Sequence, residues 1–183
     1  MGEVQQKKEE KDSSVFLFDN KVKVWFPDIF YEDSELIEKR YPFKNKPSII
    51  KVDNTGKVFI TFDLFSKPLS TLQISGAAVS IRNILLQVYS YNNKIKLKRF
   101  KTIQGLDGVS FSFYIVNRCG RQFIEFFVLS IQGQLFMSTL TCPEENRYKW
   151  NSVFLKMKRN VQEVEKNQKE LVQKKRCLYD NEW

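Results

Sequence analysis

The sequence predicts an α+β domain, in which an antiparallel sheet of about six strands is flanked by helices on both faces. Two observations lead to this fold class. Alternating apolar and polar residues recur in several short segments, which is the period of a half-buried strand. Two longer segments instead place apolar residues three and four positions apart, which is the period of an amphipathic helix. With 183 residues, 42% of them hydrophobic, the chain is long enough to bury one core.

The first third of the chain predicts short strands and one helical turn. Asp33 or Ser34 is placed to cap that turn at its N-terminus. Asn54 and Gly56 tolerate the positive φ angles that a hairpin connection needs, so the residues around them predict a β-hairpin. The strands are expected at 15–18, 22–26, 49–52 and 58–64, and the helical turn at 35–39.

A long helix and a strand meander follow. Apolar residues recur at helical spacing from Thr71 to Tyr89, and Ser70 or Thr71 is the cap candidate. The later turns are short and contain glycine and asparagine, and connections this short require antiparallel neighbours. The strands of the meander are expected at 95–103, 109–116, 122–131 and 134–141.

The last helix is predicted to open at Cys142–Pro143–Glu144–Glu145. Proline suits a first helical turn, and glutamates favour the positive end of the helix dipole. The apolar stripe runs from Trp150 to Val164, so the helix is expected to reach Val164. The sequence thus predicts three parts: a disordered charged tail at 1–13, a single α+β domain at 14–164, and a basic helical extension or tail at 165–183.

Composition excludes several kinds of site. The chain contains no histidine, which removes Ser–His and Cys–His triads and the metal motifs that use histidine. Cys119, Cys142 and Cys177 form no close pair and read as reduced thiols in a reducing compartment. No apolar run is long enough to span a bilayer, and the charged N-terminus lacks the core of a secretory signal. We therefore expect a cytoplasmic protein with no transmembrane segment, catalytic residues, metal or cofactor.

The order of these elements resembles the PsbP-like superfamily, in particular small bacterial proteins grouped with DcrB-like and Ran-binding Mog-type members. The resemblance covers roughly Val15 to Val164, and the basic tail beyond lies outside the pattern. It implies a helix–sheet–helix sandwich and a binding or accessory role, since members bind a small GTPase, assist photosystem assembly or chaperone secretion effectors. It implies no active site. The residues that carry it are Tyr41–Pro42, 46–50, 59–62, 140–145 and Trp150.

The segment 94–101 has five positive charges and no acidic residue. A cationic strand face beside aromatic residues is one interpretation, and it would hold phosphates. The other is an edge strand that lysines protect from pairing with further chains. Alternation places Lys94, Lys96 and Lys98 on one face and Ile95, Leu97 and Arg99 on the other, and Lys101 completes the cluster.

A second basic cluster covers 156–176, with eight Lys and Arg against three Glu. A solvated helix face is the default interpretation, and docking into a partner's groove or onto anionic lipid is the alternative. Lys174, Lys175 and Arg176 are the candidate contact residues at its end.

Two residues of the apolar segments are further candidates. The strand 123–129 is apolar on both faces, as in a central strand covered on both sides, although an exposed apolar surface is the alternative. Glu125 interrupts one face, either as a specific polar anchor or, as we expect, at the rim. Cys142 precedes a helix N-terminus, a setting that can lower a thiol pKa, but packing at a strand end is the expected role.

The function expected from these observations is non-enzymatic binding of another macromolecule, as an adaptor, a chaperone or an immunity-like partner. Another protein is the expected partner. The alternative is binding to nucleic acid or another anionic surface through the basic strand 94–101 and the C-terminal basic helix, which the net charge of +9 permits.

Overall fold

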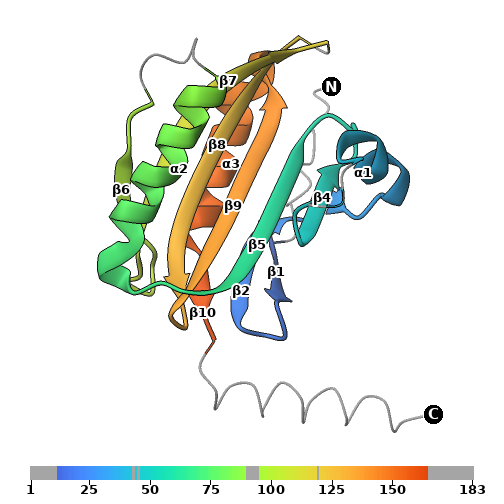
Figure 1. Cartoon of the computed structure of the whole chain (residues 1–183). Coiled ribbons are helices and arrows are strands. Elements are labelled where there is room, and N and C mark those ends of the chain that lie inside the picture. The colour runs from blue at the N-terminus through green and yellow to red at the C-terminus, as the bar shows by residue number, and fades with distance from the viewer. Residues whose placement is uncertain (1–11, 43, 45, 90–94, 119, 165–183) are drawn as a thin grey trace, which may run out of the picture.

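A seven-stranded antiparallel sheet with a helix on each face forms the centre of the molecule (Figure 1). A smaller three-stranded sheet lies beside it. The computed structural model describes residues 12–42, 44, 46–89, 95–118 and 120–164. The predicted fold class is confirmed, and the large sheet has one strand more than the approximate number expected.

The elements are as follows. The large sheet contains β3 (Phe30–Tyr31), β4 (Ile49–Asp53), β5 (Phe59–Pro68), β6 (Lys98–Lys101), β7 (Asp107–Asn117), β8 (Gly120–Ile131) and β9 (Gln134–Pro143), in the spatial order β3-β4-β5-β9-β8-β7-β6. The small sheet contains β1 (Asp12–Leu17), β2 (Val22–Pro27) and β10 (Gln162–Glu163), in the order β1-β2-β10. The helices are α1 (Ser34–Arg40), α2 (Ile74–Val88) and α3 (Arg147–Arg159), and single 3-10 turns, η1 (Thr71–Gln73) and η2 (Glu144–Asn146), precede α2 and α3.

Strand β8 belongs to the large sheet, which is the central layer of the sandwich, and both of its faces are covered. Successive side chains of a strand point to opposite faces of its sheet. Phe127 and Leu129 belong to the core cluster on the α3 side, whereas Phe126 and Val128 belong to the cluster under α2. The whole run 123–129 is buried, which confirms a strand covered on both sides. The alternative of an exposed apolar surface at this strand is wrong.

Local capping chemistry accounts for the elements that the sequence predicted well. Asp33 caps α1 by accepting a hydrogen bond from the backbone N–H of Leu36 at 3.0 Å. In the hairpin of β4 and β5, the carboxylate of Asp53 accepts hydrogen bonds from the backbone N–H groups of Lys57 and Val58, at 3.1 and 3.0 Å. These bonds satisfy donors that a helix start and a turn leave unpaired.

The end of the chain's core differs from the prediction. Helix α3 ends at Arg159, because Asn160 closes it: the backbone N–H of Asn160 donates to the carbonyls of Lys156 and Met157. The chain then extends, and β10 pairs with β2. Val161 and Val164 are buried, as the predicted helical stripe would require, but they lie in an extended segment and not in a helix. Two residues three positions apart can both be buried in a helix or in an extended segment, so their spacing does not distinguish these two conformations.

Two other expectations can be compared with the structure. Strand β1 begins at Asp12, before the expected start of the domain at residue 14. No helix in the described part of the chain combines the length and the apolarity needed to cross a bilayer. Several predicted features, namely Lys94, Cys119, Lys174, Lys175, Arg176, Cys177 and most of the tails at 1–13 and 165–183, lie outside the described residues.

Candidate functional site

A cleft of about 610 Å³ lies between α3 and the neighbouring strands β7 and β8. Its helical wall comes from residues that recur at three and four positions and therefore share one face of α3. One residue of β6, Lys98, closes it at the sheet edge. The lining residues are Ile95, Lys98, Ser112, Phe113, Tyr114, Phe123 and Glu125 from the sheet side, and Arg147, Tyr148, Asn151, Leu155 and Lys158 from α3.

A buried ion pair crosses the inner end of this cleft. The ammonium of Lys158 donates to Oε1 of Glu125 at 3.2 Å and to the hydroxyl of Ser110 at 3.0 Å. The two charged side chains are only 8% and 9% exposed. Burial raises the pKa of the Glu125 carboxyl above its ordinary value, although the positive charge of Lys158 and a hydrogen bond from Ser112 oppose the rise. Glu125 is therefore buried, and the expectation of a rim position is wrong.

Arg147 lies at the outer part of the cleft among aromatic rings. Its guanidinium donates to the hydroxyl of Tyr114 and lies 4.5 Å from the ring centre of Tyr148 and 5.9 Å from that of Phe123. Within the described residues, no carboxylate forms an ion pair with Arg147. A planar guanidinium on aromatic faces is suited to bind a carboxylate through two hydrogen bonds.

The cleft carries more positive than negative charge. Lys98, Arg147 and Lys158 face one carboxylate, Glu125, and two positive charges remain without a compensating one among the lining residues. The positive charge of Lys98, like that of Lys158, lowers the pKa of Glu125 and favours the charged form of its carboxylate. A ligand that supplies negative charge therefore fits this cleft.

The rim of the cleft is apolar and exposed. Tyr148 is 79% exposed and Leu155 is 42% exposed, although both belong to a helix whose opposite face is buried in the core. Exposed aromatic and aliphatic side chains next to an arginine are typical of the central part of protein–protein interfaces.

Strand β6 lies at the end of the large sheet, as the edge-strand interpretation expected. Its basic residues do not form one surface: Lys98 lines the cleft beside α3, whereas Arg99 lines a cavity beneath α2. Lys101 forms an exposed ion pair with Asp107 at 2.8 Å, and Lys96 is exposed. Of the sequence-predicted site residues that are described, the fold brings Lys98 and Glu125 together and leaves the others apart.

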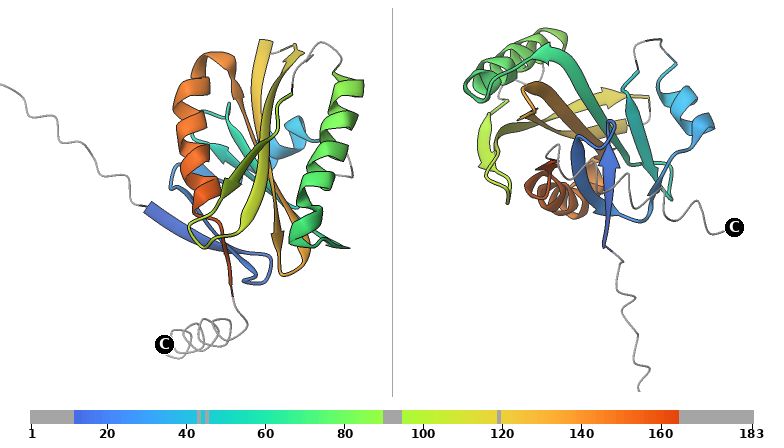
Figure 2. Two further views of the ribbon diagram at one scale, coloured as in Figure 1. Left: turned by 90° about the vertical axis from the view of Figure 1, so that its left-hand side faces the viewer. Right: turned by 90° about the horizontal axis from the view of Figure 1, so that it is seen from below.

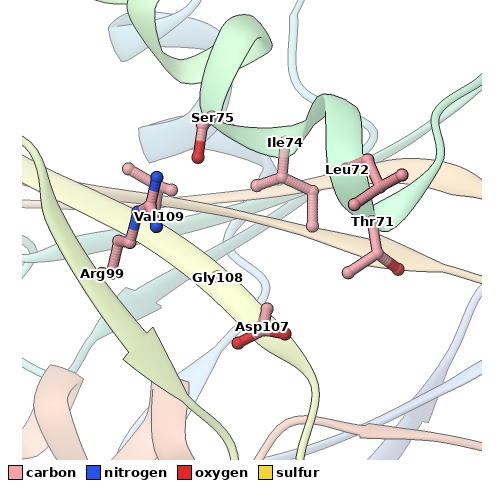
Figure 3. Close-up of a pocket in the computed structure, with 8 residues that line it drawn as sticks. All are labelled: Thr71, Leu72, Ile74, Ser75, Arg99, Asp107, Gly108 and Val109. Atoms are coloured by element: carbon pink, nitrogen blue, oxygen red, sulfur yellow. The ribbon is translucent and has the colours of Figure 1, made fainter.

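The cavity beneath α2 has a volume of about 260 Å³ and lies on the other face of the sheet edge (Figure 3). The N-terminal part of α2 and the turn η1 provide one side of it, and β6 and β7 the other. Its lining residues are Thr71, Leu72, Ile74 and Ser75 from the helical side and Arg99, Asp107, Gly108 and Val109 from the strands.

The sequence did not identify Lys158 or Arg147 as site residues. Lys158 was counted within the solvated basic cluster 156–176, and that assignment is wrong for this residue because it is 6% exposed. The signal that identifies it is its spacing: it follows Phe154 by four positions and so lies on the buried stripe of α3. A lysine on such a stripe and a glutamate on an inward strand position, Glu125, predict a buried pair.

Cys142 does not have a reactive setting. It lies in β9, is fully buried and is separated from α3 by the turn η2. Burial raises the pKa of its thiol to about 12, with a smaller contribution from Glu145. The suggestion that a helix N-terminus lowers this pKa is wrong, and packing at the strand end is confirmed.

The comparisons with known proteins identify the fold. Neither a protein-family model nor a curated protein matches the chain. Among solved structures, cyanobacterial PsbP (CyanoP) from Synechocystis sp. PCC 6803 is similar with a TM-score of 0.59 and 8% sequence identity, over 90% of this chain and 97% of that one. A crystal structure from Bacteroides thetaiotaomicron VPI-5482 is similar with a TM-score of 0.55 and 11% identity, over 84% of this chain and 49% of the other. The chain has a PsbP-like α+β fold.

Proposed function

We propose that this chain is a non-enzymatic binding protein that holds a segment of another protein in the cleft beside α3. One observation carries the proposal: a single cleft of about 610 Å³ has both uncompensated positive charge and an exposed apolar rim. Such a cleft fits a segment in which an acidic side chain lies next to an aromatic or aliphatic one. The cytoplasmic location expected from the sequence is part of this proposal.

Arg147 and Tyr148 are the expected main contacts. Arginine and tyrosine contribute most often to binding energy at protein interfaces, because they combine a large contact area with hydrogen bonding. Arg147 presents its guanidinium between aromatic rings, and Tyr148 exposes most of its side chain beside it. An incoming carboxylate would thus meet a charge that is already oriented.

Glu125 supports binding over acid–base catalysis. It is the only carboxylate among the described residues that line the cleft, and Lys158 and Ser112 both bond to it. A general base needs a lone pair directed at its substrate. The engaged carboxylate instead holds α3 against β8, which fixes the helical wall that carries Arg147.

The nucleic-acid alternative has less support from the arrangement of the basic residues. A phosphate backbone needs several cations on one continuous surface. Lys98 and Arg99 point to opposite faces of the sheet, and Lys158 is buried. The described cations of this region therefore do not form such a surface.

Site-directed photo-crosslinking in the native cells tests the proposal. A benzophenone amino acid replaces Tyr148 at the cleft or, as the control, Tyr31, which is also exposed but lies in β3 at the opposite end of the large sheet. We expect a discrete protein adduct from position 148 alone, and its loss when Arg147→Glu is added. Adducts that are the same at both positions, adducts that survive Arg147→Glu, or adducts to nucleic acid alone would reject the proposal.

A further inference from the structure

We propose that the partner segment binds as an additional β-strand along the outer edge of β6, with alternate side chains entering the cleft beside α3 and the cavity beneath α2. This inference rests on the proposed function, because it specifies how a partner occupies that cleft. Strand addition of this kind draws its affinity from main-chain hydrogen bonds and its selectivity from pockets for alternate side chains.

The outer edge of β6 is open within the described part of the chain. Strand β6 is the last strand of the large sheet and, of the strands that the structure describes, pairs with β7 alone. Figure 2 (left) looks onto this side of the molecule and shows the sheet edge between α3 and α2. An added strand would therefore lie between the two helices.

The hydrogen-bond phase of β6 shows which backbone groups face outward. The N–H of Thr102 donates to the carbonyl of Leu106 at 3.0 Å, and this pair continues the β6–β7 register. Hydrogen-bonded pairs alternate with non-bonded pairs in an antiparallel ladder. Lys98 and Phe100 therefore bond to β7, whereas the backbone groups of Arg99 and Lys101 point away from it.

Among the described residues, nothing in the backbone pairs with these outward groups. No backbone hydrogen bond within the described residues involves the N–H or C=O of Arg99 or Lys101 on this side. Two residues further on, the outward N–H of Ile103 donates to the carbonyl of Arg159 at 2.8 Å. That bond confirms that the backbone groups of alternate residues point outward. It also occupies the outer edge of the sheet directly after β6, so an added strand could not extend past this point.

The two hollows flank this edge on opposite faces of the sheet. Lys98 lines the cleft beside α3 and the adjacent Arg99 lines the cavity beneath α2. Because side chains alternate along a strand, successive residues of an added strand would face the two hollows in turn. The residue beside Lys98 enters a cleft with excess positive charge, so a carboxylate is expected there.

The smaller cavity selects a different side chain. Its volume of about 260 Å³ and its mixed lining, in which Ile74 and Val109 lie beside the opposite charges of Arg99 and Asp107, fit a small polar or branched aliphatic residue. The expected segment thus alternates acidic with small or β-branched residues. The cations of β6 disfavour pairing with the same edge of a second copy and favour such an acidic strand.

A proline substitution separates the backbone contribution from the side-chain contribution. Lys101→Pro removes one outward N–H and leaves the β6–β7 ladder intact, as proline on an edge strand permits. Lys101→Ala keeps that N–H but loses the same side chain and its ion pair with Asp107, so a comparison of the two variants isolates the contribution of the backbone. The probes are peptides selected on the full-length chain from a random peptide library, with affinity measured by fluorescence anisotropy.

We expect the selected peptides to alternate acidic with small or β-branched residues. Lys101→Pro should bind them about tenfold or more weakly than Lys101→Ala does, a difference of about 1.4 kcal/mol. N-methylation of each peptide amide in turn tests the same contact without altering the protein. It should abolish binding at every second residue and have little effect at the residues between.

The outcomes separate the two proposals. If Arg147→Glu abolishes peptide binding while Lys101→Pro binds as tightly as Lys101→Ala and N-methylation has no effect, the proposed function stands and strand addition is rejected. Peptides that bind as helices, with no alternation in the N-methyl series, also reject strand addition and leave the proposed function standing. A library that yields no peptide dependent on Arg147 rejects both proposals.

Discussion

The pair of Glu125 and Lys158 places two charged groups inside the packed layer between β8 and α3. Removing charges from water costs several kcal/mol for each ion, and their attraction offsets this cost only while both are present. Ser110 and Ser112 supply further hydrogen bonds, one to each partner. The loss of a single partner is therefore expected to be more harmful than the loss of both.

Lys158→Met tests this expectation. The substitution leaves a buried carboxylate without its cation and should lower the free energy of unfolding by about 3–5 kcal/mol at pH 8. The double variant Glu125→Gln/Lys158→Met removes both charges and should recover most of that loss. Urea denaturation of the three proteins measures the differences. A double variant no more stable than Lys158→Met would show that packing, and not charge, dominates at this position.

The same pair gives a pH dependence with a defined sign. Burial raises the pKa of Glu125 in the folded protein above its ordinary value of 4.5. Stability from this group is therefore fully present below pH 4.5 and is lost as the pH rises through the raised pKa. In Lys158→Met that pKa rises further, so its stability deficit should grow between pH 5 and pH 8. Glu125→Gln/Lys158→Met should show no such growth in parallel denaturation series.

Cys142 is expected to be chemically inert in the folded protein. A thiol with a pKa of about 12 is almost entirely protonated at pH 8, and its burial also blocks access. Iodoacetamide at pH 8 should leave Cys142 unmodified in the native protein and should modify it in guanidinium. Peptide mapping by mass spectrometry gives the answer, and rapid native alkylation of Cys142 would contradict the buried placement.

At the scale of elements, the turn between β1 and β2 carries local backbone strain. Phe18, Asp19 and Asn20 have φ angles of 54°, 54° and 60°, so three successive non-glycine residues are left-handed. This conformation costs roughly 1–2 kcal/mol for an ordinary residue, and less for Asn and Asp. The edge-to-face contact of Phe18 with Phe136, with ring centres 6.2 Å apart, helps to hold the turn.

Asp19→Gly should relieve part of this strain. Glycine adopts positive φ without steric cost, and the gain should exceed its larger chain entropy in the unfolded state, giving about 0.5 kcal/mol of added stability. Asp28→Gly is the matched control, since Asp28 is also exposed in a turn but does not have a positive φ. The Asp28→Gly variant should lose a similar amount of stability. Thermal denaturation of both variants makes the comparison, and equal shifts would argue against strain at Asp19.

Strand β10 anchors the end of the core to the small sheet. It follows α3, and Val164 donates its backbone N–H to the carbonyl of Lys21 at 3.0 Å. The side chain of Glu163 also accepts a hydrogen bond from the backbone N–H of Gln132, at 2.7 Å. This short segment thus connects α3, the β1–β2 hairpin and the β8–β9 turn.

Two truncations isolate this anchor. A chain that ends at Val164 keeps β10, and a chain that ends at Asn160 loses it together with two buried valines. Full burial of a valine contributes roughly 1.5–3 kcal/mol, so the shorter chain should be less stable by about 3–6 kcal/mol. Calorimetric melting of the two chains gives the difference. Equal melting temperatures would mean that β10 adds nothing to the core.

The elements also show how far the sequence could predict this molecule. The hairpin of β4 and β5, the Asp33 cap and the alternation of β8 were predictable, because each depends on residues close together in the sequence. Strands β3 and β10 have two residues each and exist through pairing with distant partners, which no local pattern records. For the cleft, Lys98 and Glu125 were identified separately. Their convergence depends on the β6–β7–β8 register and on the rotation of α3.

At the scale of the whole molecule, the two helical layers are packed unequally. Helix α3 buries Trp150, Phe154, Met157 and Lys158 against the sheet. Helix α2 buries only Ile74 and Ala78, and it leaves Ile84 and Val88 59% and 64% exposed. The small sheet adds Val22 and Val24, among others, to the core on the α3 side. The α3 layer therefore holds most of the packing energy.

This inequality predicts a hierarchy of local opening. Amide hydrogen exchange follows the free energy needed to break local structure, which falls where few apolar contacts hold an element in place. Amides of α2 should exchange through local opening well before those of α3 and β8, which should approach the free energy of global unfolding. Native-state exchange read by mass spectrometry measures both. Equal protection of the two helices would show that the sandwich opens as one unit. Early exchange of α2 would instead show that this helix, which lies beside the edge of β6, can move when a strand is added there.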